Sequence, residues 1–386
     1  MKCSLFLFDF SFSLWLNSDI YMRQRIIDLT KDLVKFRSVA GNAVEKRAVL
    51  DYVHNWFETR DFALEKFEHI DAPSLLVNIP GQANKKLLFM VHLDVVSASD
   101  ELFTVRQEGD KLFGRGVLDN KGMSAALMLL AEKIKESEGV FPDINIIFTT
   151  DEEIGGENGA KRLANLEKIK DVDFIIVPDG GDHDRIVYKE KGIINLHLEI
   201  LGKSAHAARP WLGINPIEKA YDLYRKINDL FAAEDFSDEK HWHPTVALTR
   251  LIAGQEFNKI PASAELGINI RFTENYSPEE LLEKIKTCFD DSVRVKDIKI
   301  TPCLVSHENH EHIDNYRKVM ETGLGKPISV VGEHGASDAQ YFQHLGVPII
   351  LHRPAGDGLH AEHEQIDLVS LEKFIDNWKK FLEKFN

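Results

Sequence analysis

The stretch that decides the fold is INIIFTTDEEIGG, residues 144–156, in which an apolar run ends in three consecutive carboxylates. Short apolar runs of the same kind alternate with helical patterns along the chain, and three of them are KLLFMVH (86–92), DFIIVPD (173–179) and VPIILH (347–352). This alternation is typical of an α/β fold with a mostly parallel sheet. Ligands of such sheets bind at the carboxyl ends of the strands, so the polar residues that follow the runs are the candidate site residues.

The pattern changes in the second half of the chain. Residues 191–305 predict strand, helix, strand, strand, helix and strand, which is the order of a ferredoxin-like α+β unit. We expect this unit to be inserted as a lid and dimerisation domain into a catalytic domain of residues 22–190 plus 306–386. Helical apolar spacing begins at Met22, so residues 1–21 are expected to be an N-terminal extension outside the fold.

Composition excludes several classes of function. The 386 residues are 44% hydrophobic and carry 47 Lys+Arg against 62 Asp+Glu, a net charge of −15, which argues against nucleic acid as a partner. No apolar run is long enough to span a membrane. The three cysteines lack CxxC spacing, which fits a reducing cytoplasm. Asp9 interrupts the apolar opening stretch, so secretion is only the alternative to a cytoplasmic location.

Polar residues that suit divalent cations follow the predicted strands. His92 and Asp94 end one run, Asp179 ends another, Asp119 lies in the turn GRGVLDNKG (114–122), and His360 comes shortly after the last strand. Taken singly, each has an ordinary alternative: HxD is common, an aspartate in a turn can cap a helix, and a charge cluster can be solvated. Together they place two imidazoles and several carboxylates at one edge, which is how two cations are held side by side.

Five motifs occur in a fixed order, and together they carry a resemblance. They are HxD (92–94), GRGVLDNKG (114–122), DEEIGG (151–156), the carboxylate at 179 and HxxxE (360–364). From about residue 22 onward the chain resembles the zinc-dependent deacylases and exopeptidases that include acetylornithine deacetylase, succinyl-diaminopimelate desuccinylase, aminoacylase and carboxypeptidase G. The resemblance implies two Zn²⁺ ions per subunit, with Co²⁺ or Mn²⁺ as alternatives for such ligands.

The resemblance also implies the metal ligands. His92 and Asp179 would bind one ion, Glu153 and His360 the other, and Asp119 would bridge both. Aminopeptidase-like and dipeptidase members tend to carry Asp at position 179, whereas acylase and carboxypeptidase members tend to carry Glu.

Two further carboxylates have implied roles that are not metal binding. Asp94 would orient the imidazole of His92 and raise its basicity. Glu152 would be the general base, which takes a proton from the attacking water and passes it to the leaving amine.

Three residues of the inserted domain match further family segments. His206 lies in GKSAHAARP (202–210), and the resemblance implies that it reaches the active site of the partner subunit in a homodimer and stabilises an oxyanion. Asn258 and Arg271 would bind the free carboxylate of the substrate. The alternatives are a surface histidine in a loop and an arginine paired on an exposed strand face.

The expected function is therefore hydrolysis of an amide bond near a free carboxylate, in a small molecule or a short peptide. The enzyme would be either an N-acyl amino acid deacylase or a dipeptidase or carboxypeptidase. The alternative is a catalytically inactive metal-binding scaffold of the same fold, which a missing ligand or base would indicate. The chain has a suitable residue at all six positions, which are the five predicted ligands and the predicted base.

Overall fold

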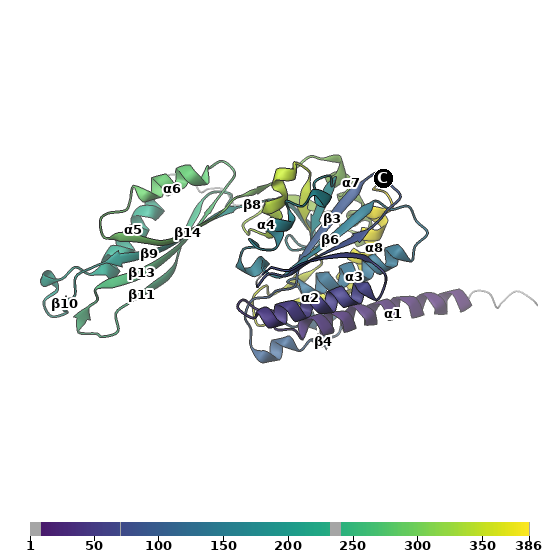
Figure 1. Ribbon diagram of the computed structural model, residues 1–386, viewed down its shortest axis with the longest axis horizontal. Coiled ribbons are helices and arrows are strands. Elements are labelled where there is room, and N and C mark those ends of the chain that lie inside the picture. The colour runs from purple at the N-terminus through teal and green to yellow at the C-terminus, as the bar shows by residue number, and fades with distance from the viewer. Residues whose placement is uncertain (1–8, 70, 232–240, 386) are drawn as a thin grey trace, which may run out of the picture. The chain divides into compact units, whose positions relative to one another are not determined.

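The computed structural model describes residues 9–69, 71–231 and 241–385. The chain forms two compact units (Figure 1). Unit 1 comprises Met1–Tyr188, Ser306–Val331 and Ser337–Asn386, and unit 2 comprises Lys189–Val305 and Gly332–Ala336. The first helix, α1 (Asp9–Val34), begins before Met22, while residues 1–8 of the predicted extension lie outside the described residues.

The main sheet of unit 1 has parallel strands at its centre. Its order runs β1-β2-β6-β3-β7-β17-β8, with bounds Ala63–Phe67, Ser74–Ile79, Asp143–Thr149, Lys86–His92, Phe174–Val177, Ile349–Leu351 and Arg185–Glu190. Two short strands, β15 (Leu304–Val305) and β16 (Ser329–Glu333), also pair with β8. The neighbours β6, β3, β7 and β17 are parallel, whereas β1, β2 and β8 join antiparallel. The predicted α/β class is confirmed, and the four predicted apolar runs are these four central strands.

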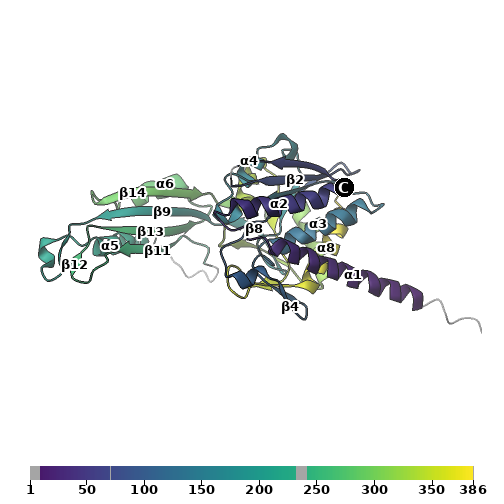
Figure 2. The same cartoon turned by 60° about the horizontal axis from the view of Figure 1, so that its bottom comes forward.

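Five long helices share one core with this sheet. They are α1, α2 (Ala43–Glu58), α3 (Lys121–Lys135), α7 (Glu311–Leu324) and α8 (Leu368–Leu382). Leu87, Phe89 and Val91 of β3 belong to the same core because alternate residues of a strand point to one face. Figure 2 shows α3 and α8 side by side beneath the sheet. Each large apolar side chain buried here contributes roughly 1.5–3 kcal/mol to the free energy of unfolding.

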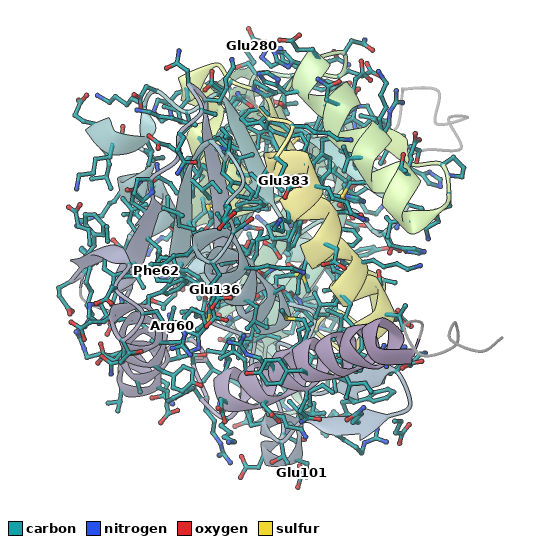
Figure 3. The ribbon with its side chains drawn as sticks, turned by 90° about the vertical axis from the view of Figure 1, so that its right-hand side faces the viewer. Arg60, Phe62, Glu101, Glu136, Glu280 and Glu383 are labelled. Carbon is teal, nitrogen blue, oxygen red and sulfur yellow. The ribbon has the colours of Figure 1, made fainter. Side chains whose placement is uncertain are left out.

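The ends of α2 and α3 are fastened to each other. Arg60 and Phe62 follow α2 and lie beside Glu136 at the end of α3 (Figure 3). The Lys135 ammonium lies 4.6 Å from the centroid of the Phe62 ring and donates to the Asp61 carbonyl at 2.6 Å. These contacts join the end of α3 to the segment between α2 and β1.

A small antiparallel sheet of unit 1 brings two distant loops together. Its order is β18-β19-β5-β4, with bounds Gly356–Asp357, Gln365–Asp367, Lys111–Phe113 and Arg106–Glu108. Because β19 pairs with β5, the loop before β19 and the turn after β5 start from adjacent strands. These segments carry His360 and Asp119, respectively.

Unit 2 has the predicted element order. Its sheet runs β11-β13-β9-β14, with bounds Thr245–Ala253, Ser263–Phe272, Gly192–Leu201 and Val293–Thr301, and all neighbours are antiparallel. The helices α5 (Pro216–Asp229) and α6 (Pro278–Lys286) bury Leu223 and Ile285 against it. Two short strands, β10 (Ala205–His206) and β12 (Lys259–Ile260), pair with each other.

No helix of the described chain combines the length and apolarity needed to cross a membrane.

Candidate metal centre

The site lies where parallel strands end. His92 is the last residue of β3 and pairs in register with Thr149, the last residue of β6. The strand β7 lies on the other side of β3 and ends at Val177. The three carboxyl ends therefore bring His92, the segment 151–153 and Asp179 to one edge.

Two groups of ligating atoms lie at this edge. In the first, His92 Nε2 is 3.0 Å from Asp119 Oδ1 and 3.5 Å from Asp179 Oδ1. In the second, His360 Nε2 is 3.1 Å from Asp119 Oδ2 and 3.3 Å from Glu153 Oε2. Asp119 thus gives one carboxylate oxygen to each group.

The donor atoms fit two small divalent cations. Zinc lies about 2.0–2.2 Å from nitrogen and oxygen ligands, so two donors on one tetrahedral ion are about 3.4 Å apart. The four separations above span 3.0–3.5 Å. Imidazole and carboxylate ligands suit Zn²⁺, Co²⁺ and Mn²⁺. The residues present fit a two-metal centre.

Electrostatics of the two histidines point the same way. Hydrogen bonds to Asp119 and Glu153 raise the pKa of His360 to about 10. Burial alone would lower the pKa of His92, but the carboxylates of Asp179 and Asp119 outweigh it and raise that pKa well above its usual value. Without a cation, the carboxylates therefore hold both imidazoles in the protonated form.

The charged form of the neighbouring acids is unfavourable without a cation. Burial and the nearby Asp179 raise the pKa of Glu152 well above its usual value. Burial and the nearby Asp151 do the same for Asp338, which is 3% exposed. Such a concentration of acids is what positive ions at this edge would stabilise.

Asp94 holds the turn that carries the predicted base. Its carboxylate accepts from the backbone N–H of Glu152 at 3.2 Å and of Glu153 at 3.1 Å. The expected contact to His92 comes instead from the Asp94 carbonyl oxygen, 3.0 Å from Nδ1, whereas the carboxylate is 3.6 Å away. The residue thus contacts both sides of the site, and its main chain rather than its carboxylate lies closest to the imidazole.

The three predicted residues of unit 2 fall into two places. His206 of β10 is exposed and pairs in register with Lys259, the neighbour of exposed Asn258. Arg271 is half-buried near the end of β13 and pairs with Ile193, whereas the opposite end of β13, at Ser263, pairs with Leu201. At the rise of an antiparallel strand, Ser263 and Arg271 are about 27 Å apart. Within one chain, Asn258 and Arg271 therefore do not meet.

Comparisons with known proteins now identify the family. The model of the family described as "Peptidase family M20/M25/M40" matches residues 88–384 of this chain. The chain belongs to this family. It is 26% identical to carboxypeptidase G2 of Pseudomonas sp. (strain RS-16), over 90% of this chain and 86% of that one. It is 25% identical to the probable succinyl-diaminopimelate desuccinylase of Staphylococcus aureus (strain MRSA252), over 92% of this chain and 96% of that protein.

The fold of this M20 chain also matches solved structures. A tripeptidase from Staphylococcus aureus superposes with a TM-score of 0.79 at 19% identity, covering 94% of this chain and 98% of that one. The predicted family resemblance is confirmed, and the protein is a hydrolase of the M20 metallopeptidase family.

Several residues that support the site of this M20 hydrolase were missed from the sequence. Asn120 donates through Nδ2 to Asp179 Oδ1 at 3.1 Å and to the Pro178 carbonyl at 2.9 Å. The Tyr341 hydroxyl donates to the Gly155 carbonyl at 2.6 Å and so holds the turn after Glu153. Asn120 stands inside the quoted GRGVLDNKG motif, which was the available signal. Tyr341 has no motif signal, because its partner is a main-chain atom of a distant loop.

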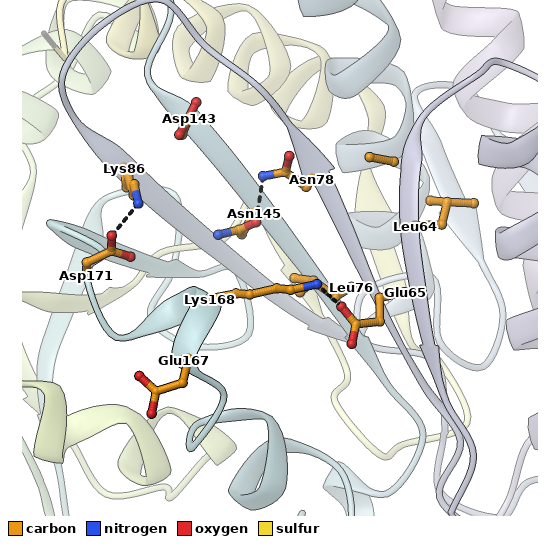
Figure 4. Close-up of a pocket in the computed structure, with 11 residues that line it drawn as sticks. Leu64, Glu65, Leu76, Asn78, Lys86, Asp143, Asn145, Glu167, Lys168 and Asp171 are labelled. Atoms are coloured by element: carbon orange, nitrogen blue, oxygen red, sulfur yellow. Dashed lines mark hydrogen bonds and ion pairs between the residues drawn. The ribbon is translucent and has the colours of Figure 1, made fainter.

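A pocket of about 370 Å³ lies at the other end of the sheet (Figure 4). It is lined near the starts of β3 and β6 and contains none of the predicted site residues. Four of its charged groups form two ion pairs, Lys86 with Asp171 and Lys168 with Glu65. Glu167 pairs with Lys170, and Asp143 accepts from the N–H of Gly81 at 2.6 Å. We assign no ligand to it.

Metal binding to this M20 chain should depend on pH. Because the folded, metal-free protein holds the proton on His360 more tightly than the unfolded chain does, the associated stabilisation is complete below about pH 6.5 and is lost towards pH 10. A cation needs the neutral imidazole, so its affinity rises over the same range. We expect the gap in thermal unfolding midpoint between zinc-loaded and chelator-treated protein to widen from pH 6.5 to about 8.5.

Differential scanning calorimetry of both forms at several pH values measures this gap. The buried Lys121, whose pKa falls to about 7 through burial, titrates over part of this range. Its ionisation contributes to both forms, so the gap largely removes its effect. A gap that stays constant or narrows with rising pH would contradict the assignment of these histidines as ligands.

Proposed function

We propose that the protein is a dinuclear zinc hydrolase that cleaves an amide bond near a free carboxylate. The observation that carries this proposal is the position of the Asp119 carboxylate between the two groups of donors. Its two oxygens lie 3.0 and 3.1 Å from Nε2 of His92 and Nε2 of His360, respectively. One carboxylate shared between two groups of donors is the arrangement that holds two cations close together. His92 and Asp179 would hold one ion, and Glu153 and His360 the other.

Residues of the chain itself would transfer the proton and position the base. Two divalent cations at this site would polarise the amide carbonyl and lower the pKa of a water molecule. Glu152 belongs to neither group of donors, and burial raises its pKa, so it suits proton transfer from the water to the leaving amine. Asp94 fixes the backbone of Glu152 and thereby the position of this base.

Unit 2 would supply substrate contacts. The planar guanidinium of Arg271 suits a substrate carboxylate, and burial lowers its pKa only from a very high value, so it stays charged. His206 would stabilise the developing oxyanion, and Asn258 would assist at the carboxylate. Because Asn258 and His206 lie at one end of the sheet and Arg271 at the other, we propose a homodimer in which the first two serve the partner's site. Sedimentation that shows only monomer would remove this role in trans.

The substrate class is an amide with a free carboxylate, and both deacylation and peptide hydrolysis are open to such a site. The relatives carry names of both kinds, a carboxypeptidase and a desuccinylase. A panel of N-acyl amino acids and dipeptides, tested with protein reloaded with Zn²⁺, decides between them. We expect turnover on at least one member, and a tenfold or larger loss when its free carboxylate is amidated.

Two results of this panel would contradict the proposal. Equal turnover of the amidated substrate would remove the role of the carboxylate. No turnover on any member, with two ions bound, would favour the inactive scaffold.

We also propose a reducing cytoplasmic location, which the unpaired thiols of Cys288 and Cys303 support.

A further inference from the structure

A buried ion pair joins the two loops that carry Asp119 and His360. The pair is Arg115, 3% exposed, and Glu364, fully buried, with Arg115 Nη1 2.7 Å from Glu364 Oε2. The loops are also joined through the main chain, because Gly114 N–H donates to the Glu364 carbonyl at 3.1 Å. The two partners are 249 residues apart in the chain.

Glu364 binds the backbone of the turn that contains Asp119. Its Oε1 accepts from the N–H of Leu118 at 2.9 Å and of Asp119 at 3.1 Å. The N–H of Gly116 reaches both oxygens, at 3.0 and 2.9 Å. A carboxylate that accepts several backbone hydrogen bonds fixes that backbone strongly, since each bond is charge-assisted.

Arg115 extends the link to the other loop. Its Nη2 donates to the carbonyl of His360 at 3.0 Å and to that of Ala361 at 3.2 Å. His360 has φ of +60°, a left-handed conformation that a non-glycine residue adopts only when its surroundings hold it there. The hydrogen bond from the Arg115 guanidinium to the His360 carbonyl helps to hold His360 in this conformation.

We propose that Arg115 and Glu364 are positioning residues that assemble the second cation site, the one made by Asp119, Glu153 and His360. They act through the main chain of Asp119 and His360 and touch no reacting atom. This inference rests on the proposed function, because it presumes that those residues bind a cation. The first site shares Asp119 but has two further supports: His92 ends β3, and Asp179 is held by Asn120.

The geometry distinguishes this role from general stabilisation. An ion pair that served only the core would have no reason to bond the N–H of one ligand and the carbonyl of another. The inference therefore expects a graded effect: weakening the pair loosens the second site, where it holds both Asp119 and His360, more than the first site, where it holds only Asp119.

The test uses three variants of the full chain. Glu364→Gln keeps the shape but removes the charge. Arg115→Lys keeps the charge but lacks the planar fork that reaches Glu364 and His360 together. Glu372→Gln is the matched control, since Glu372 accepts two hydrogen bonds from Arg23 at 2.7 Å, between α8 and α1.

Titration of metal-free protein with Zn²⁺ against a competing chelator measures the two affinities separately. Wild type and Glu372→Gln should bind two ions. Glu364→Gln and Arg115→Lys should bind the second ion roughly 10- to 100-fold more weakly, as is usual when a partner of a ligand is lost, and the first ion less weakened, because that site shares only Asp119 with the pair. Saturating Zn²⁺ should restore much of the activity.

Two outcomes overturn the inference alone: both variants bind both ions as tightly as wild type, or both sites weaken equally. If Glu364→Gln does not fold, Arg115→Lys decides the matter. If wild type itself binds no second ion, the proposed function fails together with the inference.

Discussion

Replacing Glu152 by Gln should lower turnover by about 10²–10⁴-fold, the usual contribution of a general base. Glutamine has nearly the same shape and cannot accept the proton. Because Glu152 is in neither group of cation donors, both ions should stay bound. We therefore expect the loss to appear in kcat. It is measured on the best substrate of the panel, and the metal content is determined in parallel.

A matched control lies in the same loop. Glu157 is exposed and follows the turn that carries Glu152, so Glu157→Gln should behave like wild type. If Glu152→Gln kept turnover within about tenfold of wild type, the residue could not be the base, because that loss is below the range expected for one.

Replacing Asp119 by Ala should empty both cation sites. Its two oxygens are shared between the groups, so one substitution removes a donor from each. Loss of an outer partner already costs roughly 10–100-fold in affinity, and loss of a direct ligand costs more. Metal analysis after dialysis at fixed free Zn²⁺ should show both ions gone, and activity should disappear with them.

The control for Asp119 is a ligand that belongs to one group only. His92→Ala should weaken the first site, where its Nε2 lies, far more than the second. Retention of one ion at wild-type affinity in Asp119→Ala would show that this carboxylate does not bridge the sites.

Much of this site could be predicted from the sequence because it follows strand ends. The runs that end near His92, Asp151 and Asp179 are strongly apolar, and their parallel pairing brings their carboxyl ends together. The order of the motifs, through the family resemblance, then selected the proposed ligands. Strands β1 and β2 were not predicted: β1 is mixed in composition and largely unburied, whereas β2 has an apolar run, Leu75–Val77, that was overlooked.

The supporting contacts could not be predicted for a physical reason. Glu364 bonds the N–H of Asp119 across 245 residues, and a backbone donor leaves no side-chain signature in sequence. The same holds for Tyr341, whose partner is the Gly155 carbonyl. Likewise, the motifs of unit 2 suggested that Asn258 and Arg271 act on one carboxylate, but only the register of β13 shows that they lie at opposite ends.

Anomalous diffraction from crystals grown with Zn²⁺, measured at the zinc edge, tests the two-metal account most directly. The account predicts two peaks, one beside His92 and Asp179 and one beside Glu153 and His360, with Asp119 touching both. Asp182, His183 and Asp184 form another cluster of possible ligands in unit 1. A single peak at the strand ends, or peaks only at that other cluster, would contradict the account.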